Sequence, residues 1–198
     1  MKLNLILLLV LIAAGLHANA DGLKLGEPSY GGSGCPAGSA SVSISPEQSS
    51  LSILFDQYIV EAGSNGKSFD RKNCNLAIPI TIPQGYSYSV IAIDYRGFTS
   101  IPSGGRAQLA VNYFLAGGGA GVRTSKTFYG PVQSDYVKSD RLGVEAVVWS
   151  ACGADTILRT NTSMLVQTNR KMDDAMATVD SADVQAGIIY QLQWRRCN

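Results

Sequence analysis

The chain has 198 residues, with 16 Lys and Arg against 15 Asp and Glu, and its single histidine is His17. His17 and Lys2 lie within residues 1–20, so a chain without that segment has no histidine and equal numbers of acidic and basic residues. This composition excludes a Ser-His-Asp triad, a Cys-His pair and a His-ligated zinc site. It also argues against a nucleic acid partner, because Lys and Arg clusters supply most of that affinity.

Residues 1–20 have the three parts of a secretory signal peptide. Lys2 gives the positive region, residues 3–16 form the apolar region, and Ala18-Asn19-Ala20 is a small-x-small cleavage site. The apolar run is short for a membrane span, which needs about 20 residues. We therefore expect cleavage after Ala20 rather than an N-terminal anchor, and no membrane span afterwards. The expected location is secreted or extracellular, or periplasmic in a Gram-negative bacterium.

Residues 21–34 are rich in Gly, Pro and Ser and predict an extended N-terminal arm, after which residues 35–198 suit one domain. Alternation of apolar and polar residues predicts strands along this domain. They cover residues 39–45, 51–56, 76–82, 86–95, 107–115, 122–129, 144–150, 156–167 and 184–194, and residues 58–62 continue the second strand or follow a bend. Since no convincing amphipathic helix accompanies them, we expect an all-β fold. It would be a single antiparallel β-sandwich, with the jelly roll as one form of it, held by two disulfides.

Residues 70–102 are the densest in sequence features and are interpreted as a hairpin to which the other strands are added. Pro79 cannot donate a ladder hydrogen bond, so its strand should lie at an edge or present this position outward. Pro83-Gln84-Gly85 would turn the chain. The apolar phase then moves to odd positions after Val90, which predicts a β-bulge there.

Four cysteines in an exported chain indicate disulfides, and they allow three pairings. We favour Cys35–Cys74 and Cys152–Cys197, because each pair would tie the end of one predicted strand to a strand near it in sequence. The spacing contains no C-x-x-C zinc or redox motif. No metal and no cofactor is expected.

Seven short motifs follow one another in a fixed order along residues 31–197. The motifs occupy residues 34–36 (Gly-Cys-Pro), 51–56, 70–74, 83–85, 96–97, 149–153 (Trp-Ser-Ala-Cys-Gly) and 194–197 (Trp-Arg-Arg-Cys). In this pattern the chain resembles an exported family of fungi and bacteria known as domain of unknown function 4360. The resemblance implies export, two disulfides and a β-rich fold. It implies no established activity, so no functional residue is carried over.

The candidate binding residues are Asp94, Tyr95 and Arg96, at the expected end of a strand, with Tyr86 and Tyr88 earlier on the same strand. A carboxylate, a phenol and a guanidinium at a strand end could contact a sugar, and flat rings could stack on one. The alternatives are a turn-capping or ion-paired Asp94 and tyrosines packed in the core. No catalytic residue is assigned.

Glycoside hydrolysis needs only two carboxylates, and the candidates are Asp56, Asp70, Asp94 and Glu145. Nothing in the sequence places two of them at catalytic distance. The acidic residues at 173–183 lack the order of a calcium loop and indicate a solvated turn. Asn161-Thr162-Ser163 is a glycosylation sequon in a eukaryotic host.

These observations favour an exported, non-catalytic β-sandwich that binds a glycan or a cell-surface protein. One alternative is a carboxylate-dependent polysaccharide hydrolase. Another is a protease inhibitor, for which residues 130–142, expected to be an irregular polar loop, would be the exposed segment. An enzyme is the less favoured reading, and this expectation is partly a fold-level analogy.

Overall fold

The computed structural model describes residues 24–46, 50–117, 121–141, 149–179 and 188–197. The predicted signal peptide, Glu145 and most of the predicted strand over 144–150 lie outside these residues. The described residues form strands and no helix. The strands are β1 (Lys24–Leu25), β2 (Ser29–Gly31), β3 (Ala40–Ile44), β4 (Ser50–Phe55), β5 (Ile59–Ala62), β6 (Phe69–Thr81), β7 (Tyr86–Ile101), β8 (Arg106–Leu115), β9 (Val122–Tyr129), β10 (Val132–Arg141), β11 (Thr156–Gln167), β12 (Ala175–Thr178) and β13 (Ile188–Arg196).

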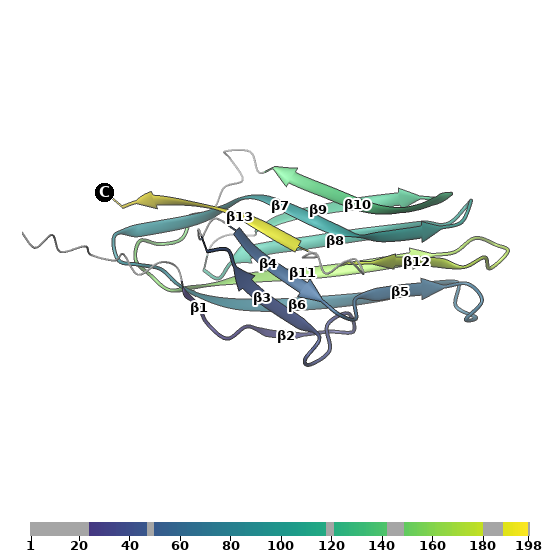
Figure 1. Ribbon diagram of the computed structural model, residues 1–198, viewed down its shortest axis with the longest axis horizontal. Coiled ribbons are helices and arrows are strands. Elements are labelled where there is room, and N and C mark those ends of the chain that lie inside the picture. The colour runs from purple at the N-terminus through teal and green to yellow at the C-terminus, as the bar shows by residue number, and fades with distance from the viewer. Residues whose placement is uncertain (1–23, 47–49, 118–120, 142–148, 180–187, 198) are drawn as a thin grey trace, which may run out of the picture.

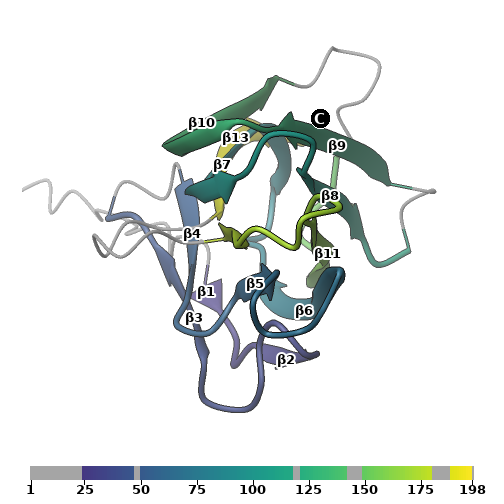
Figure 2. The same cartoon turned by 90° about the vertical axis from the view of Figure 1, so that its right-hand side faces the viewer.

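The strands form two antiparallel sheets packed face to face, which confirms the predicted all-β sandwich (Figures 1 and 2). Sheet A has the order β1-β6-β11-β8-β9, with β2 also paired to β6. Sheet B has the order β3-β4-β13-β7-β12-β5, with β10 paired to the other edge of β7. Along one side of the sandwich β9 lies next to β10, and Lys138 of β10 donates to Thr124 of β9 at 3.3 Å.

The central hairpin predicted over residues 70–102 is wrong, because β6 and β7 lie in different sheets. The connection through Pro83–Gly85 carries the chain from sheet A to sheet B. Both strands have an apolar face, and these two faces meet across the core instead of lying in one sheet. Each strand finds its ladder partners far away in sequence: β6 pairs with β11, and β7 pairs with β13 and β10.

Two local predictions on these strands are confirmed. Pro79 is exposed, and its carbonyl accepts a hydrogen bond from Gly26 at 2.8 Å, between the stretches of β6 that pair with β1 and β2. The register of β7 against β13 shifts where Gln191 faces Ala92 and Leu192 faces Val90. The extra residue is Ile91, so the bulge adjoins Val90 as the change of apolar phase predicted.

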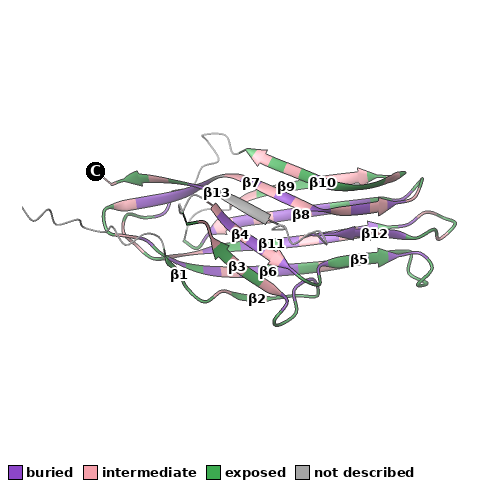
Figure 3. Cartoon of the chain, in the orientation of Figure 1, coloured by how far each residue is buried: buried purple, intermediate pink, exposed green. Residues whose placement is uncertain are grey.

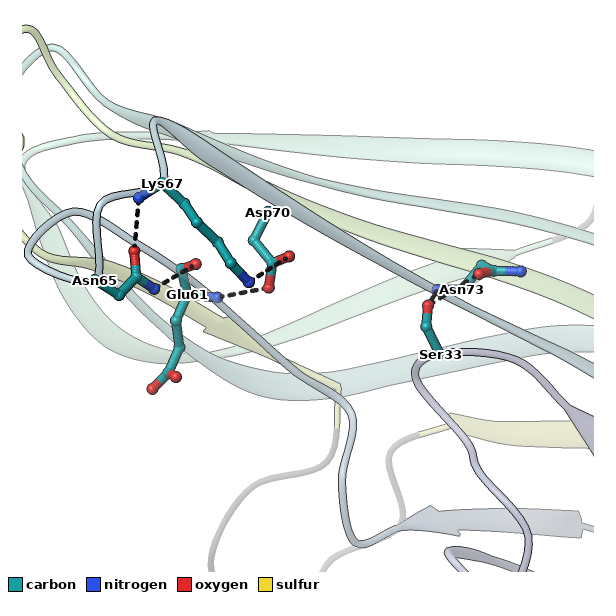
Figure 4. Close-up of polar contacts among 6 residues, drawn as sticks. All are labelled: Ser33, Glu61, Asn65, Lys67, Asp70 and Asn73. Carbon is teal, nitrogen blue, oxygen red and sulfur yellow. Dashed lines mark hydrogen bonds and ion pairs between the residues drawn. The ribbon is translucent and has the colours of Figure 1, made fainter.

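The favoured disulfide pairing is also confirmed. Cys35 bonds to Cys74 with Cα atoms 5.3 Å apart, and Cys152 bonds to Cys197 with Cα atoms 6.0 Å apart. The first disulfide ties the segment after β2 to β6, where Ser33 and Asn73 also exchange hydrogen bonds (Figure 4). The second joins the segment after Trp149 to the end of β13, beside the start of β7.

Besides the short β1 and β2, which lie in the segment expected as an extended arm, two strands were not predicted. The segment expected as an irregular loop over 130–142 contains β10, which pairs with β7 along its whole length. The inhibitor hypothesis thereby loses its exposed loop. The acidic segment expected as a turn contains β12, whose Ala175 and Ala177 are buried. Both were missed because ladder pairing with β7 and β5 outweighs their weak local propensity.

The core lies between the sheets and is built by strict alternation along the strands, visible as alternating buried and exposed positions in Figure 3. Its largest fully buried members are Leu51, Ile53, Tyr58, Ile78, Ile80, Tyr88, Ile93, Tyr95, Leu109, Leu158 and Met164. Burial raises the pKa of Tyr58 to about 12, although Thr162 donates to its hydroxyl at 3.1 Å. Nothing in the described part of the chain forms a helix long and apolar enough to cross a membrane.

Candidate ligand-binding site

The predicted site at Asp94, Tyr95 and Arg96 does not lie at a strand end, because β7 continues to Ile101. Tyr95 is 0% exposed and points into the core, where Lys138 Nζ lies 4.8 Å from its ring centroid. Asp94 and Arg96 occupy alternate positions and lie on the outer face of sheet B, opposite Ser139 and Val137 of β10. The three residues therefore belong to two different faces of the sheet.

Tyr86 and Tyr88 lie at the other end of β7. Tyr88 is 0% exposed and packs against Trp194, with ring centroids 5.9 Å apart. Tyr86 is half-buried, and Arg196 both covers its ring at 5.9 Å and donates from Nε to its hydroxyl at 3.3 Å. Tyr88 thus presents no ring to a ligand at the surface. The structure does not bring the five predicted binding residues together.

A half-buried Trp149 lies on the outer face of sheet B, near the second disulfide. It forms a bridge with Ser89, and the guanidinium of Arg195 lies 4.2 Å over its ring. Such a cation–π contact is worth about 0.5–1 kcal/mol at an exposed site. Because Arg195 already covers the ring, Trp149 is not an open stacking platform.

The outer face of sheet A is different, and we call it the ladder face. It consists of the outward side chains of β6, β11, β8 and β9, which are exposed or half-buried and mostly polar. The alternation of the strands places odd positions of β6, β11 and β9 and even positions of β8 on this face. Side chains that are far apart in sequence therefore form straight rows across four strands.

The central row contains Asn75, Asn161, Asn112 and Arg123, each level with the next across the sheet. Asn112, Asn161 and Arg123 line an open hollow of about 410 Å³, together with Ser163 and other residues of β8, β9 and β11. The side-chain oxygen of Asn112 is buried and has no hydrogen-bond partner among the described residues. An unsatisfied buried acceptor is costly, so a ligand hydroxyl entering the hollow would give this amide a bond that the protein does not supply.

Another row of the ladder face carries its exposed aromatic side chains. Phe69 and Tyr129 are 60% and 71% exposed and stand at the two ends of this row, with Gln167 and Arg106 between them. Arg106 Nε donates to Gln167 Oε1 at 3.1 Å. With strands about 4.8 Å apart, the two rings are separated by three strand spacings, about 14 Å.

The carboxylates proposed for hydrolysis lie elsewhere. Asp56 is exposed after β4, and Asp94 lies on the outer face of sheet B. Asp70 accepts a hydrogen bond from the backbone of Glu61 at 3.3 Å and pairs with Lys67 at 3.5 Å, which secures the turn between β5 and β6 (Figure 4). Among the described residues, no cluster of three or more His, Cys, Asp and Glu could hold a metal ion.

The acidic segment at Asp173–Asp174 also secures loops. Asp173 accepts from Asn169 Nδ2 at 2.7 Å, and Asp174 accepts from the backbone of Ser64 at 2.8 Å. Hydrogen bonds from Ser64 lower the pKa of Asp174. These contacts join the turn after β11 to the turn between β5 and β6.

The ladder face was not predicted from the sequence, although many of its residues lie in predicted strands. Asn161 was noted only as the start of a sequon, and Phe69 was not singled out. The usable signal was the run of polar residues at alternate positions in the predicted strands over 107–115, 122–129 and 156–167. What was missing was the register, which decides whether those residues share a row.

Comparisons with known proteins agree with the resemblance seen in the sequence. The family model described as domain of unknown function DUF4360 matches residues 21–197. A protein of Arthroderma benhamiae named "Uncharacterized secreted protein" is 32% identical over 169 residues, which cover 85% of this chain and 69% of that protein. Like that relative the protein is secreted, and its two disulfides suit that location.

Among solved structures, TmCBM61 in complex with beta-1,4-galactotriose is similar over 86% of this chain and 88% of that chain, with 12% sequence identity and a TM-score of 0.27. A likeness at this TM-score carries no argument about function.

Proposed function

The chain belongs to the DUF4360 family, and for this member we propose non-catalytic binding of a glycan on the ladder face. The observation that carries the proposal is the central row of Asn and Arg side chains around the hollow, with exposed Phe69 and Tyr129 on the same face. Amide and guanidinium groups match the hydroxyl groups of a sugar as donors and acceptors. Exposed rings supply flat apolar area for a sugar ring.

The shape of the face supports a polymer more than a small molecule. Small-molecule sites are usually concave and bury most of the ligand, whereas this hollow is open and continuous with the rows beside it. A chain laid across the strands could contact several rows at once. The second disulfide and the covered Trp149 lie on the other sheet and leave the ladder face unobstructed by described residues.

The ladder face supports binding rather than hydrolysis. Outward positions of β6, β11, β8 and β9 carry no Asp or Glu. Glycoside hydrolysis by the common mechanisms needs two carboxylates on either side of the scissile bond. A glycan on this face would therefore be held without being cleaved by the side chains that contact it.

The test is a glycan array probed with the purified secreted protein, followed by calorimetry on the strongest ligand. Exchange of both Phe69 and Tyr129 for alanine should lower the affinity about tenfold, since each stacked ring is worth about 0.5–1.5 kcal/mol. The matched control is Val137→Ala, which removes an exposed apolar side chain, 58% exposed, from the outer face of sheet B. Absence of binding to every glycan, or an equal loss in the control, would overturn the proposal.

A further inference from the structure

We infer that the ligand of the ladder face is an anionic glycan, one that bears carboxylate or sulfate groups along its chain. This inference rests on the proposed glycan-binding function and adds the chemical class of the glycan. It comes from the sorting of charges on the face. Four arginines point outward from β6, β11, β8 and β9, and no acidic side chain accompanies them: the arginines are Arg71, Arg106, Arg123 and Arg159.

The four guanidinium groups are exposed and are not neutralised by the protein. Arg71 Nε donates to Ser163 Oγ at 2.8 Å, and Arg106 Nε donates to Gln167 at 3.1 Å. Both acceptors are neutral, so they orient these side chains and leave the charge uncompensated. The ion pairs Lys67–Asp70 and Lys138–Asp140 involve none of the four arginines.

Their spacing suits a repeating anion. Arg123 and Arg159 lie on β9 and β11 with β8 between them, and Arg71 and Arg106 lie on β6 and β8 with β11 between them. Each pair is thus two strand spacings apart across the sheet, about 10 Å. In the strand register, Arg71 is level with Leu165 and Arg106 is level with Tyr129. The pair of Arg71 and Arg106 therefore lies about 20 Å along the strands from the pair of Arg123 and Arg159.

Arginine is the side chain best suited to such a ligand. Its planar guanidinium forms two parallel hydrogen bonds with a carboxylate or a sulfate-like group and stays charged at every accessible pH. The asparagines of the central row are level with Arg123 of the first pair, and the open hollow extends from this row toward the second pair through Ser163 and Ser125. Neutral sugar hydroxyls would contact the amides while the anionic groups reach the arginines.

A glycan fits better than a nucleic acid. Nucleic acid sites neutralise many closely spaced phosphates, commonly with a strongly basic domain. Here only four cations are spread over a wide face, and the secreted chain as a whole has balanced charge. A polymer with one anion per sugar or per few sugars matches that density.

The experiment measures the affinity of the full secreted protein, made in a bacterial periplasm so that the disulfides form and Asn161 stays unmodified. The probes are polygalacturonate and dextran sulfate as anionic glycans, β-1,4-galactan and dextran as neutral ones, and single-stranded DNA as a non-glycan polyanion. We expect binding to at least one anionic glycan, falling as salt rises. Whichever of the two binds more tightly identifies the anionic group.

The decisive variant exchanges Arg123 and Arg159 for glutamine and should lower the affinity about tenfold, in the range expected for two exposed charge-assisted contacts. Its control exchanges Arg141 and Arg195 on sheet B for glutamine, with the same change in net charge. Urea unfolding of both proteins verifies that they are folded.

The outcomes separate the two levels of the proposal. Equal binding of neutral and anionic glycans, insensitive to salt, would overturn the anionic class while leaving glycan binding intact. No binding to any glycan would overturn the proposed function itself. DNA binding as tight as that of the anionic glycans, or an equal loss in the sheet B control, would mark a general attraction for polyanions and overturn the assignment to glycans.

Discussion

The outer faces of the two sheets differ in how their charges are sorted. On the ladder face the outward side chains of four strands include arginines and no carboxylate. On the outer face of sheet B, Asp94, Asp135 and Glu61 stand among Arg96 and Arg141. A chain of balanced net charge therefore carries one face of a single sign and one face of mixed sign. Net charge alone does not reveal such a site.

The exposure of aromatic side chains also differs between the two outer faces. On the ladder face Phe69 and Tyr129 are exposed at the ends of a row. On the outer face of sheet B, Trp149 lies beneath Arg195. The lesson is that exposure, more than residue type, separates a stacking surface from a structural contact. Tyr88 and Tyr95 show the same point, because both are tyrosines of β7 and both are enclosed in the core.

The largest effect tests whether the ladder face really points to solvent. Leu158 and Leu165 lie on the same strand, β11, with Leu158 fully buried and Leu165 half-buried on the ladder face. We expect Leu158→Ala to lower the free energy of unfolding by about 2–5 kcal/mol, because it opens a core cavity. Leu165→Ala should cost less than about 1 kcal/mol. Urea unfolding measures both, and comparable losses would mean that this face is covered.

The next largest effect on the free energy of unfolding is expected from removing one of two buried tyrosine hydroxyls. Tyr58 Oη donates to the Lys72 carbonyl at 3.3 Å and accepts from Thr162, whereas Tyr88 Oη has no hydrogen-bond partner among the described residues. We expect Tyr58→Phe to cost about 1–2 kcal/mol, because it removes a buried hydroxyl that makes two hydrogen bonds, although Thr162 keeps the Cys74 carbonyl as an acceptor. Tyr88→Phe should be neutral or stabilising. Equal losses in urea unfolding would contradict this difference.

The same two tyrosines, Tyr58 and Tyr88, predict a loss of stability at alkaline pH. Burial raises the pKa of Tyr58 to about 12 and also raises the pKa of Tyr88. In the unfolded chain, tyrosine hydroxyls ionise near pH 10. The contribution of Tyr58 to stability is therefore complete below pH 10 and is lost as the pH rises from 10 to about 12. Tyrosinate absorbance should appear together with unfolding. The Tyr58→Phe protein should lose less stability over this interval, and a curve identical to that of the native protein would argue against the shift.

Most of the fold could be predicted from local patterns. Alternation located β9 and β11 at their observed bounds, and the change of apolar phase at Val90 located the bulge. The disulfide pairing followed from short separations in sequence. What failed was the partner of each strand: β6 and β7 are adjacent in sequence but lie in different sheets. Periodicity describes the faces of one strand and contains no information on which strand lies beside it.

The candidate binding residues are separated in the structure for the same physical reason. Asp94, Tyr95 and Arg96 were grouped because they are consecutive, yet consecutive residues in a strand point to opposite faces. The central row of the ladder face joins Asn75, Asn112, Asn161 and Arg123 through register alone. Such a row could be recognised only after the strand order was known.

A smaller effect is expected when one acidic side chain is added to each outer face. Ser125 of β9 and Ser139 of β10 are both exposed and point outward, the first two residues from Arg123 and the second opposite Asp94. Ser125→Asp should lower the affinity for an anionic glycan about tenfold, about 1.4 kcal/mol, since it compensates Arg123 and repels the ligand. Ser139→Asp should leave the affinity unchanged. Equal losses would mean that binding responds to net charge and not to the ladder face.

The smallest expected effect is the response of binding to pH between 5 and 8. The chain without residues 1–20 has no histidine, and guanidinium groups stay protonated throughout this range. Carboxylates of a polyuronide and sulfate groups are also ionised there, so the affinity of the ladder face should be flat. Fluorescence titrations at several pH values and constant ionic strength make this measurement. A change in affinity of more than about threefold between pH 5 and 8 would place the ligand on groups other than the four arginines. The same titrations with the Arg123 and Arg159 double variant would show whether the remaining binding has that pH dependence.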